Sequence, residues 1–278
     1  MATGSDRVQR GIQSIEVGGQ LLRAMVHHGR PMALKDLARE ADMTPAKAHP
    51  YMVSFGRLGL IEQDGASGHY LLGPLALQLG LIGLQQADPV RIAAPLLAPL
   101  ARAIGQTVAI AVWGARGATI VQIAEAPSPV HVSLRHGTVF SPTRTASGRL
   151  FAAHLPQEVV RRQLDAERRR ERQHPTADAD ADAGATARPG LPAPAPLPSW
   201  AEFELQLQEV RTQGASRSAN EVVPGVSAMA APVFDHTGAI VLAMTAIGPS
   251  GTFDTGWDGP VAQALKENAN AVSKRLGR

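Results

Sequence analysis

The 278-residue sequence predicts an α+β protein with two folding units joined by a connector helix. Apolar residues recur at helical spacing, interrupted by glycine and proline, up to about residue 87. From about residue 106, apolar runs of strand length alternate with helical segments. The composition agrees, because 44% hydrophobic residues can fill two cores, and these are mainly aliphatic since only 4% of the residues are aromatic.

The first unit opens with three predicted helices. Residues 14–31 show helical recurrence of apolar side chains, which Gly18 and Gly19 should weaken. Residues 34–41 place apolar side chains at i, i+3, i+4 and i+7, which is one buried face of a short helix. Thr44 and Pro45 then supply an N-cap hydroxyl and a proline at the first helical position, so a third helix begins there and ends at Gly59.

Two short extended runs follow, on either side of the turn-rich segment 64–68. This pattern predicts a β-hairpin. Three helices and a hairpin form a winged helix-turn-helix, to which we assign residues 8–74. We assign residues 75–88 to a connector helix that packs against a further surface, such as a second subunit, and that Pro89 ends.

Residues 89–278 form the second predicted unit, an α/β domain with an antiparallel sheet. A helix with prolines near its start covers 91–105, and a further helix begins near Thr145. A final helix runs from about Trp257 to Leu276. The predicted strands are 106–113, 118–126, 129–135, 226–235 and 239–248.

A low-complexity segment interrupts this unit at about 174–199, where Ala alternates with Asp and then with Pro. It carries too little apolar area to offset backbone ordering, so we interpret it as a disordered insertion. The basic run 168–172 before it is either a solvated helix end or a phosphate contact.

Charge alone does not identify a partner. The pI is about 9.7, but the net charge is only +3, and residues 1–75 hold eight Lys and Arg against seven Asp and Glu. The absence of cysteine excludes disulfides, thiol catalysis and cysteine-based zinc sites. There is neither an apolar run of membrane-spanning length nor a signal-like start, so we expect a cytoplasmic protein. We also expect neither a cofactor nor a metal.

The sequence resembles the IclR-type bacterial transcriptional regulators. The resemblance rests on SIEVGGQLLRA, LKDLAREADMTPAKAH, GLIEQD with GHYLLGP, PTRTASGR, EVVPGVSAMAAPVFDHTG and TAIGP, in this order along the chain. It implies a DNA-reading N-terminal domain and a GAF-like C-terminal domain that binds a small organic effector. It also implies dimers, often paired into tetramers, that repress or activate transcription at an operator.

The third helix is the candidate DNA reader, because the N-terminal side chains of a recognition helix meet base edges in the major groove. The hairpin tip, Asp64 to His69, would lie over the adjacent backbone or minor groove. Pro50 should cost about 3 kcal/mol or more in a straight helix, so we expect a kink and weakened or altered operator binding. The candidate DNA-binding residues are Lys35, Thr44, Pro45, Ala46, Lys47, His49, Tyr51, Ser67 and His69.

The effector site is expected where a helix begins at Thr145, because exposed first-turn amides can cradle an anion and small residues let a ligand approach. By the resemblance, positions 218, 228, 245 and 247 form the opposite wall. Weakly polar residues there favour an aromatic or longer apolar acid, with Arg135, His136 and Arg144 as candidate charges at the mouth. The candidate effector-binding residues are Thr145, Ala146, Ser147, Gly148, Ser218, Ala228, Thr245 and Ile247.

Two rival functions remain open. An enzyme is disfavoured because the sequence has no GxSxG, HExxH or P-loop spacing, and the adjacent His27 and His28 point apart on a helix. The second rival is a ligand sensor or oligomerisation protein whose DNA binding is impaired by Pro50.

Overall fold

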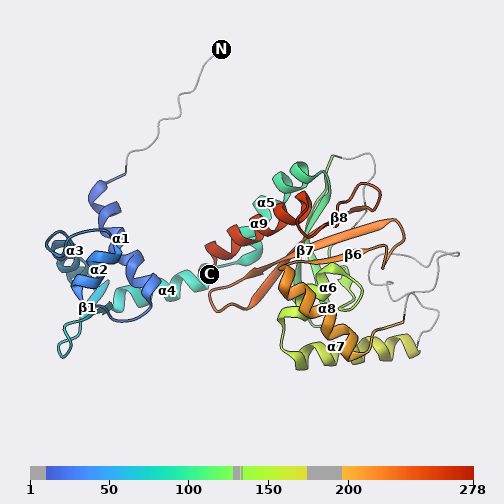
Figure 1. Ribbon diagram of the computed structural model, residues 1–278, viewed down its shortest axis with the longest axis horizontal. Helices are drawn as coiled ribbons and strands as arrows, with labels where there is room; N and C mark the ends of the chain where they lie inside the picture. Colours follow the sequence, from blue (N-terminus) through green and yellow to red (C-terminus); the bar gives the residue numbers. More distant parts are fainter. Residues whose placement is uncertain (1–10, 128–131, 133, 174–195) are drawn as a thin grey trace, which may run out of the picture. The chain divides into compact units, whose positions relative to one another are not determined.

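The computed structural model describes residues 11–127, 132, 134–173 and 196–278. The chain divides into two compact units, one ending at Ala87 and the other beginning at Asp88 (Figure 1).

The first unit has the three helices and the hairpin that the sequence predicts. The helices are α1 (Gln13–His28), α2 (Leu34–Glu40) and α3 (Pro45–Leu58), and the hairpin strands are β1 (Ile61–Gln63) and β2 (Tyr70–Leu72). The strands pair antiparallel, with Ile61 opposite Leu72. The helices and the hairpin enclose one core that includes Leu21, Leu37, Met52 and Ile61. Helix α4 (Pro74–Gln86) follows the hairpin.

The two glycines in α1 have different surroundings. Gly18 is buried, and a Cβ built on it would lie 2.9 Å from ring atoms of both Tyr51 and Phe55. A Cβ on Gly19 would meet open space. Gly18 therefore lets α1 approach α3 closely, and the helix continues through both positions because it gains this packing.

Prolines occur inside two helices. Pro50 lies within α3, and Pro95 and Pro99 lie within α5 (Pro89–Ile104). The prediction that the prolines of this segment sit near the start of its helix is wrong, because Asp88 caps α5 through the amides of Val90 and Arg91. All three interior prolines are exposed, so water can satisfy the carbonyls that they leave unpaired.

The second unit contains a sheet of order β5-β4-β3-β8-β7-β6 within the described residues. All of its neighbouring strands pair antiparallel. The strands are β3 (Thr107–Gly114), β4 (Gly117–Ala124), β5 (Val139–Phe140), β6 (Ser216–Ala219), β7 (Val226–Phe234) and β8 (Ile240–Pro249).

Helices cover both faces of this sheet, as Figure 1 shows. Helices α5 and α9 (Pro260–Arg275) pack on one face through Leu97, Leu265 and Val272. On the other face lie α6 (Ala146–His154), α7 (Gln157–Gln173) and α8 (Trp200–Gln213). The antiparallel sheet with helices on both faces matches the predicted fold class.

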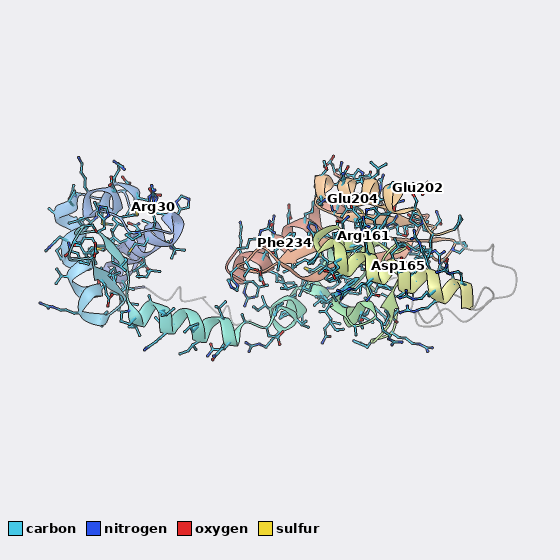
Figure 2. All side chains as sticks on the ribbon, turned by 90° about the horizontal axis from the view of Figure 1, so that it is seen from below. Arg30, Arg161, Asp165, Glu202, Glu204 and Phe234 are labelled. Atoms are coloured by element: carbon cyan, nitrogen blue, oxygen red, sulfur yellow. The ribbon has the colours of Figure 1, made fainter. Side chains whose placement is uncertain are left out.

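Packing between α7 and α8 includes a cation–π contact. The guanidinium carbon of Arg161 lies 4.4 Å from the centroid of the Trp200 ring. Arg161 and Asp165 of α7 are labelled beside Glu202 and Glu204 of α8 in Figure 2. Ser199 and Glu202 form a capping box that starts α8.

Some predicted boundaries need correction. The described residues of the predicted strand 129–135, namely Val132, Leu134 and Arg135, are not in a strand, and the edge pairing is made instead by Val139 and Phe140. The final helix begins at Pro260, not near Trp257, because proline is favoured at the first helical position. Residues 174–195 of the predicted insertion lie outside the described residues.

Within the described residues, none of the helices has the length and apolar character needed to cross a bilayer.

Candidate nucleic-acid interface and effector site

The N-terminal half of α3 presents a solvent-facing surface. Pro45, Ala46, Lys47 and His49 are exposed, whereas Ala48 is buried in the core below them. The Thr44 hydroxyl accepts a hydrogen bond from the Lys47 amide at 3.3 Å, so Thr44 caps α3 as the sequence predicts. The first turn of α3 contains no acidic residue, which leaves its positive dipole end available to an anion.

Tyr51 is placed differently from the other α3 candidates. It is half-buried, and its ring packs on Gly18 and the core of the first unit. Pro50, its neighbour, lies on the exposed side of α3, and its carbonyl accepts from the Ser54 hydroxyl at 3.0 Å. This surface of α3, defined by residues 44–50, is called the α3 face below.

The wing is the hairpin of β1 and β2 with its turn, residues 61–72. Side chains within the turn stabilise its conformation. The Asp64 carboxylate accepts from the amide of Ser67 at 2.8 Å and also from the Ser67 hydroxyl. The bond from the Ser67 side chain is the main reason that the pKa of Asp64 lies below its usual value. Gly68 adopts a φ of 70°, which a turn of this kind requires. Ser67 is exposed and His69 is half-buried, so the turn presents the Ser67 side chain to solvent.

Two further basic residues flank the wing and the second helix. Lys35 on α2, one of the candidate DNA-binding residues, is exposed. Arg30, labelled in Figure 2, is also exposed and donates to His28 Nε2 at 3.0 Å. It stands two residues before Met32, which pairs with Tyr70 of β2, so Arg30 is close in sequence to the segment that pairs with the hairpin. The sequence analysis did not single out Arg30, because only this pairing reveals its position.

The predicted effector residues gather on one face of the second unit's sheet. Ser218, Ala228 and Ile247 are direct partners across β6, β7 and β8. Thr245 lies two residues before Ile247 on β8 and pairs with Ala230. Side chains at paired positions share a face, and this face carries α6.

The start of α6 is bonded to this face. The Ser147 and Thr245 hydroxyls lie 2.9 Å apart, and both residues are buried. The Ser218 hydroxyl donates to the carbonyl of Arg144 at 3.1 Å. Thr145 caps α6 by accepting from the amide of Gly148 at 3.0 Å, which takes up one first-turn amide. The amides of Ala146 and Ser147, nearest the helix start, have no acceptor within the helix itself.

The surroundings of Gly148 do not fit its expected role of letting a ligand approach the backbone. A Cβ at Gly148 would lie 2.0 Å from the carbonyl oxygen of Ser141, so the loop before α6 fills the space that a ligand was expected to use. Gly148 is therefore required for close packing of the helix on its own entry loop.

A buried carboxylate on α7 holds the same loop. Glu167 accepts from Thr143 Oγ1 at 3.0 Å and also from the Ser141 hydroxyl. Burial raises the pKa of Glu167, and the hydrogen bonds from these hydroxyls offset part of that effect. Arg144 pairs with Glu171 at 2.5 Å, so this predicted mouth charge has an acidic partner within the protein. We call residues 141–145, held in this way by α7, the entry loop.

The other two candidate mouth charges, Arg135 and His136, are exposed. Three residues of the α6 side were missed by the sequence analysis: Thr107, Arg149 and Ser216 are buried there. The alternation of serine at positions 216 and 218 was a usable signal, because period-two residues share one face of a strand.

Two family profiles match the chain along most of its length. The IclR helix-turn-helix domain matches residues 14–65, and the bacterial transcriptional regulator IclR C-terminal domain matches residues 83–181 and 195–274. The chain belongs to the IclR family. It thus combines the helix-turn-helix and C-terminal effector domains of an IclR-family transcriptional regulator, and members of this family are regulators and not enzymes.

Of three similar proteins, two align with nearly the whole chain and one with about half of it. The glycerol operon regulatory protein of Streptomyces coelicolor is 26% identical over 273 residues, 96% of this chain and 98% of that protein. The transcriptional repressor IclR of Escherichia coli is 26% identical over 155 residues, 55% of this chain and 57% of the repressor. The crystal structure of Pseudomonas aeruginosa HmgR has a TM-score of 0.80 and 32% identity, covering 96% of this chain and 98% of that one.

Proposed function

We propose that this IclR-family regulator binds an operator as a dimer or a dimer of dimers and that a small organic acid controls the binding. The observation that carries the DNA part is the α3 face. A capped helix start with exposed Lys47 and His49 can enter a major groove, and the wing stands beside it. The domain division proposed from sequence, 8–74, 75–88 and 89–278, assigns one task to each part: reading, connecting and sensing.

The proposed DNA contacts follow from exposure. On α3, Thr44, Pro45, Ala46, Lys47 and His49 face solvent, and Lys35 and Ser67 do so on α2 and the wing. The lysines would hold phosphates or guanine, and Ser67 would meet the neighbouring backbone. Tyr51 and His69 keep only part of their surface accessible, so we expect a smaller contribution from them.

The oligomer proposal rests on α4. None of its residues is buried in its own unit, although Leu77, Leu79, Leu81, Ile82 and Leu84 are all about half exposed or more. A helix that is apolar on nearly all sides needs a partner surface. A second copy of the chain supplies one and also places two α3 faces on a palindromic operator.

The effector proposal rests on the α6 side of the sheet. The hydroxyls of Ser147 and Thr245, the small side chain of Ala228 and the apolar Ile247 form a weakly polar wall. An aromatic or longer apolar acid suits this wall better than a compact, highly charged one. Because the target is chromosomal DNA, we also place the protein in the cytoplasm.

A mobility-shift and footprinting experiment with the DNA that flanks the protein's own gene tests the proposal. We expect a protected palindrome, and we expect its affinity to fall with rising salt as phosphate contacts are lost. A protein that binds no fragment of this DNA more tightly than an unrelated duplex would contradict operator binding. Several relatives carry names such as operon regulator or operon repressor, which supports the choice of flanking DNA.

One observation favours a second candidate. Pro50 lies on the α3 face itself, where it removes a backbone donor and offers no charge. A ligand sensor with impaired DNA binding would respond to effectors yet fail the footprinting experiment. The two candidates therefore differ in the DNA experiment alone.

A further inference from the structure

Several buried side-chain N and O atoms of the second unit have no hydrogen-bond partner among the described residues, and two of them belong to α6 and the strand β6 beside it. They are the Ser216 hydroxyl and the Arg149 Nε group. Ser216 is fully buried and Arg149 is 8% exposed. Leaving such donors unpaired inside a protein is costly, so each is a candidate for a partner that arrives from outside.

The two donors belong to one place in the fold. Ser216 pairs with Ala230, which pairs with Thr245, so Ser216 points to the face that carries α6. Arg149 reaches from α6 to β6, where its Nη2 donates to the carbonyl of Arg217 at 2.8 Å, next to Ser216 in the chain. The first turn of α6 lies over the same face of the sheet, because Ser147 is bonded to Thr245.

The present partners of Arg149 use only part of its guanidinium. Nη2 donates to Glu221 at 2.9 Å and weakly to the Arg144 carbonyl at 3.4 Å, in addition to Arg217. Both carboxylate oxygens of Glu221 lie 2.9 Å from Nη2. In the stronger, bidentate geometry, the two oxygens of a carboxylate accept hydrogen bonds from two different guanidinium nitrogens. Glu221 is the exposed partner, with 42% of its side chain accessible, and it can move away.

We propose that Arg149 and Ser216 form the carboxylate-binding subsite of the effector. One carboxylate oxygen would accept from Arg149 Nε and the other from Ser216 Oγ, while the apolar part of the molecule extends over Ala228 and Ile247. Glu221 competes with the effector for the guanidinium. This inference rests on the proposed effector function and defines its ligand as a monocarboxylic acid with an apolar body.

The test uses three acids, benzoate, phenylacetate and hexanoate, and their neutral amides as probes of the full-length protein. Melting temperature and calorimetric affinity are measured for each pair. We expect the acids and not the amides to raise the melting temperature of the wild-type protein, because binding to the folded state stabilises it. Equal shifts by an acid and its amide, or no response to any acid, would overturn the subsite.

Three variants locate the contact. Ser216→Ala and Arg149→Lys should each weaken acid binding about tenfold or more, since each loses one bond to a charged group. Glu221→Gln should strengthen it by removing the competing carboxylate. Ser216→Ala should leave the melting temperature of the unliganded protein unchanged or higher, because it deletes an unpaired hydroxyl.

Ser227 supplies the matched control. It is a buried serine on the same sheet, but it lies next to Ala228, so it faces the opposite side, and its hydroxyl is bonded to Ser250 at 2.8 Å. Ser227→Ala should lower the melting temperature without changing acid affinity. If Ser216→Ala behaves in the same way, the hydroxyl is structural and the subsite is wrong. Operator binding by the same samples shows separately whether the regulator proposal stands.

Discussion

At the level of single residues, the adjacent Gly18 and Gly19 of α1 allow a comparison of a packed and an unpacked glycine. A side chain at Gly18 would press on Tyr51 and Phe55, whereas a side chain at Gly19 would point into open space. We expect Gly19→Ala to stabilise the first unit by about 0.5–1 kcal/mol, because alanine favours the helix. Gly18→Ala should destabilise it by about 1–3 kcal/mol through overpacking. Chemical denaturation of both variants measures the difference, and equal effects would show that the close approach of α1 to α3 is unimportant.

Lys47 is the residue for which the DNA proposal makes its simplest prediction. Lys47→Ala should weaken operator binding and reduce the slope of log affinity against log salt by about one, because one phosphate contact is lost. Lys274, an exposed lysine in the last turn of α9, gives a control of equal charge. Lys274→Ala should change neither quantity. A similar loss in both variants would mean that net charge, not the α3 face, determines the affinity.

At the level of elements, α3 poses the question of Pro50. Two replacements separate its possible effects on DNA binding. Pro50→Ala restores the backbone donor and should raise stability by up to about 3 kcal/mol. Pro50→Arg restores the donor and also adds a cation on the exposed side of α3.

The two variants are compared by titrating operator DNA at several salt concentrations. We expect Pro50→Arg to bind more tightly and with a steeper salt dependence than Pro50→Ala. If neither variant differs from the wild-type protein in affinity or salt slope, Pro50 does not impair operator binding, and the sensor alternative loses its basis.

The entry loop and α7 form a second coupled pair of elements. Because burial raises the pKa of Glu167, the folded protein holds the proton more tightly than the unfolded chain does. Stability should therefore decrease as the pH rises from the ordinary glutamate pKa through the raised value, and then level off.

Glu167→Gln should remove this part of the pH dependence. The measurement is the difference in melting temperature between variant and wild-type protein across that acidic range. Glu158 on the same helix is the control, because its exposed carboxylate pairs with Arg162 one turn away. Glu158→Gln should leave the pH profile unchanged, and an unchanged profile in Glu167→Gln would contradict the role of burial.

Local patterns predicted most of the elements and few of the long-range contacts. The start of α3 follows from Thr44 and Pro45 alone, since capping is a local interaction. The face shared by Ser218, Ala228 and Ile247 depends on strand register, which the family resemblance supplied. Glu167 and Arg149 were not predicted, because the hydroxyls bonded to Glu167 and the carboxylate bonded to Arg149 lie 24 or more residues away in the sequence. Strand β5 has only two residues, too few for a periodic signal.

At the level of the whole molecule, the apolar surface of α4 makes the association state testable. Leu77→Glu together with Leu81→Glu should shift the protein toward monomers, because two charges would be buried at the proposed contact. Sedimentation at several concentrations measures the shift. Binding to a full palindrome should weaken more than binding to a half-site, since only the palindrome needs two linked copies.

Leu205 serves as the control for that experiment. It is a leucine on α8 with 66% exposure, similar to the 65% of Leu77, but it lies in the second unit. Leu205→Glu should leave both the association state and the palindrome affinity as they are. A monomeric Leu205→Glu protein would point to α8 as a contact between copies.

The hydrogen bond from Arg149 to β6 also bears on whether this protein can associate through the edge of its sheet. β6 is the last strand of its sheet, and a bare edge strand invites a neighbouring molecule to add a strand of its own. The Arg149 guanidinium donates a hydrogen bond to the Arg217 carbonyl, which is an acceptor that an added strand would need. We therefore expect that a protein without Arg149 would leave this edge open to pairing with another molecule.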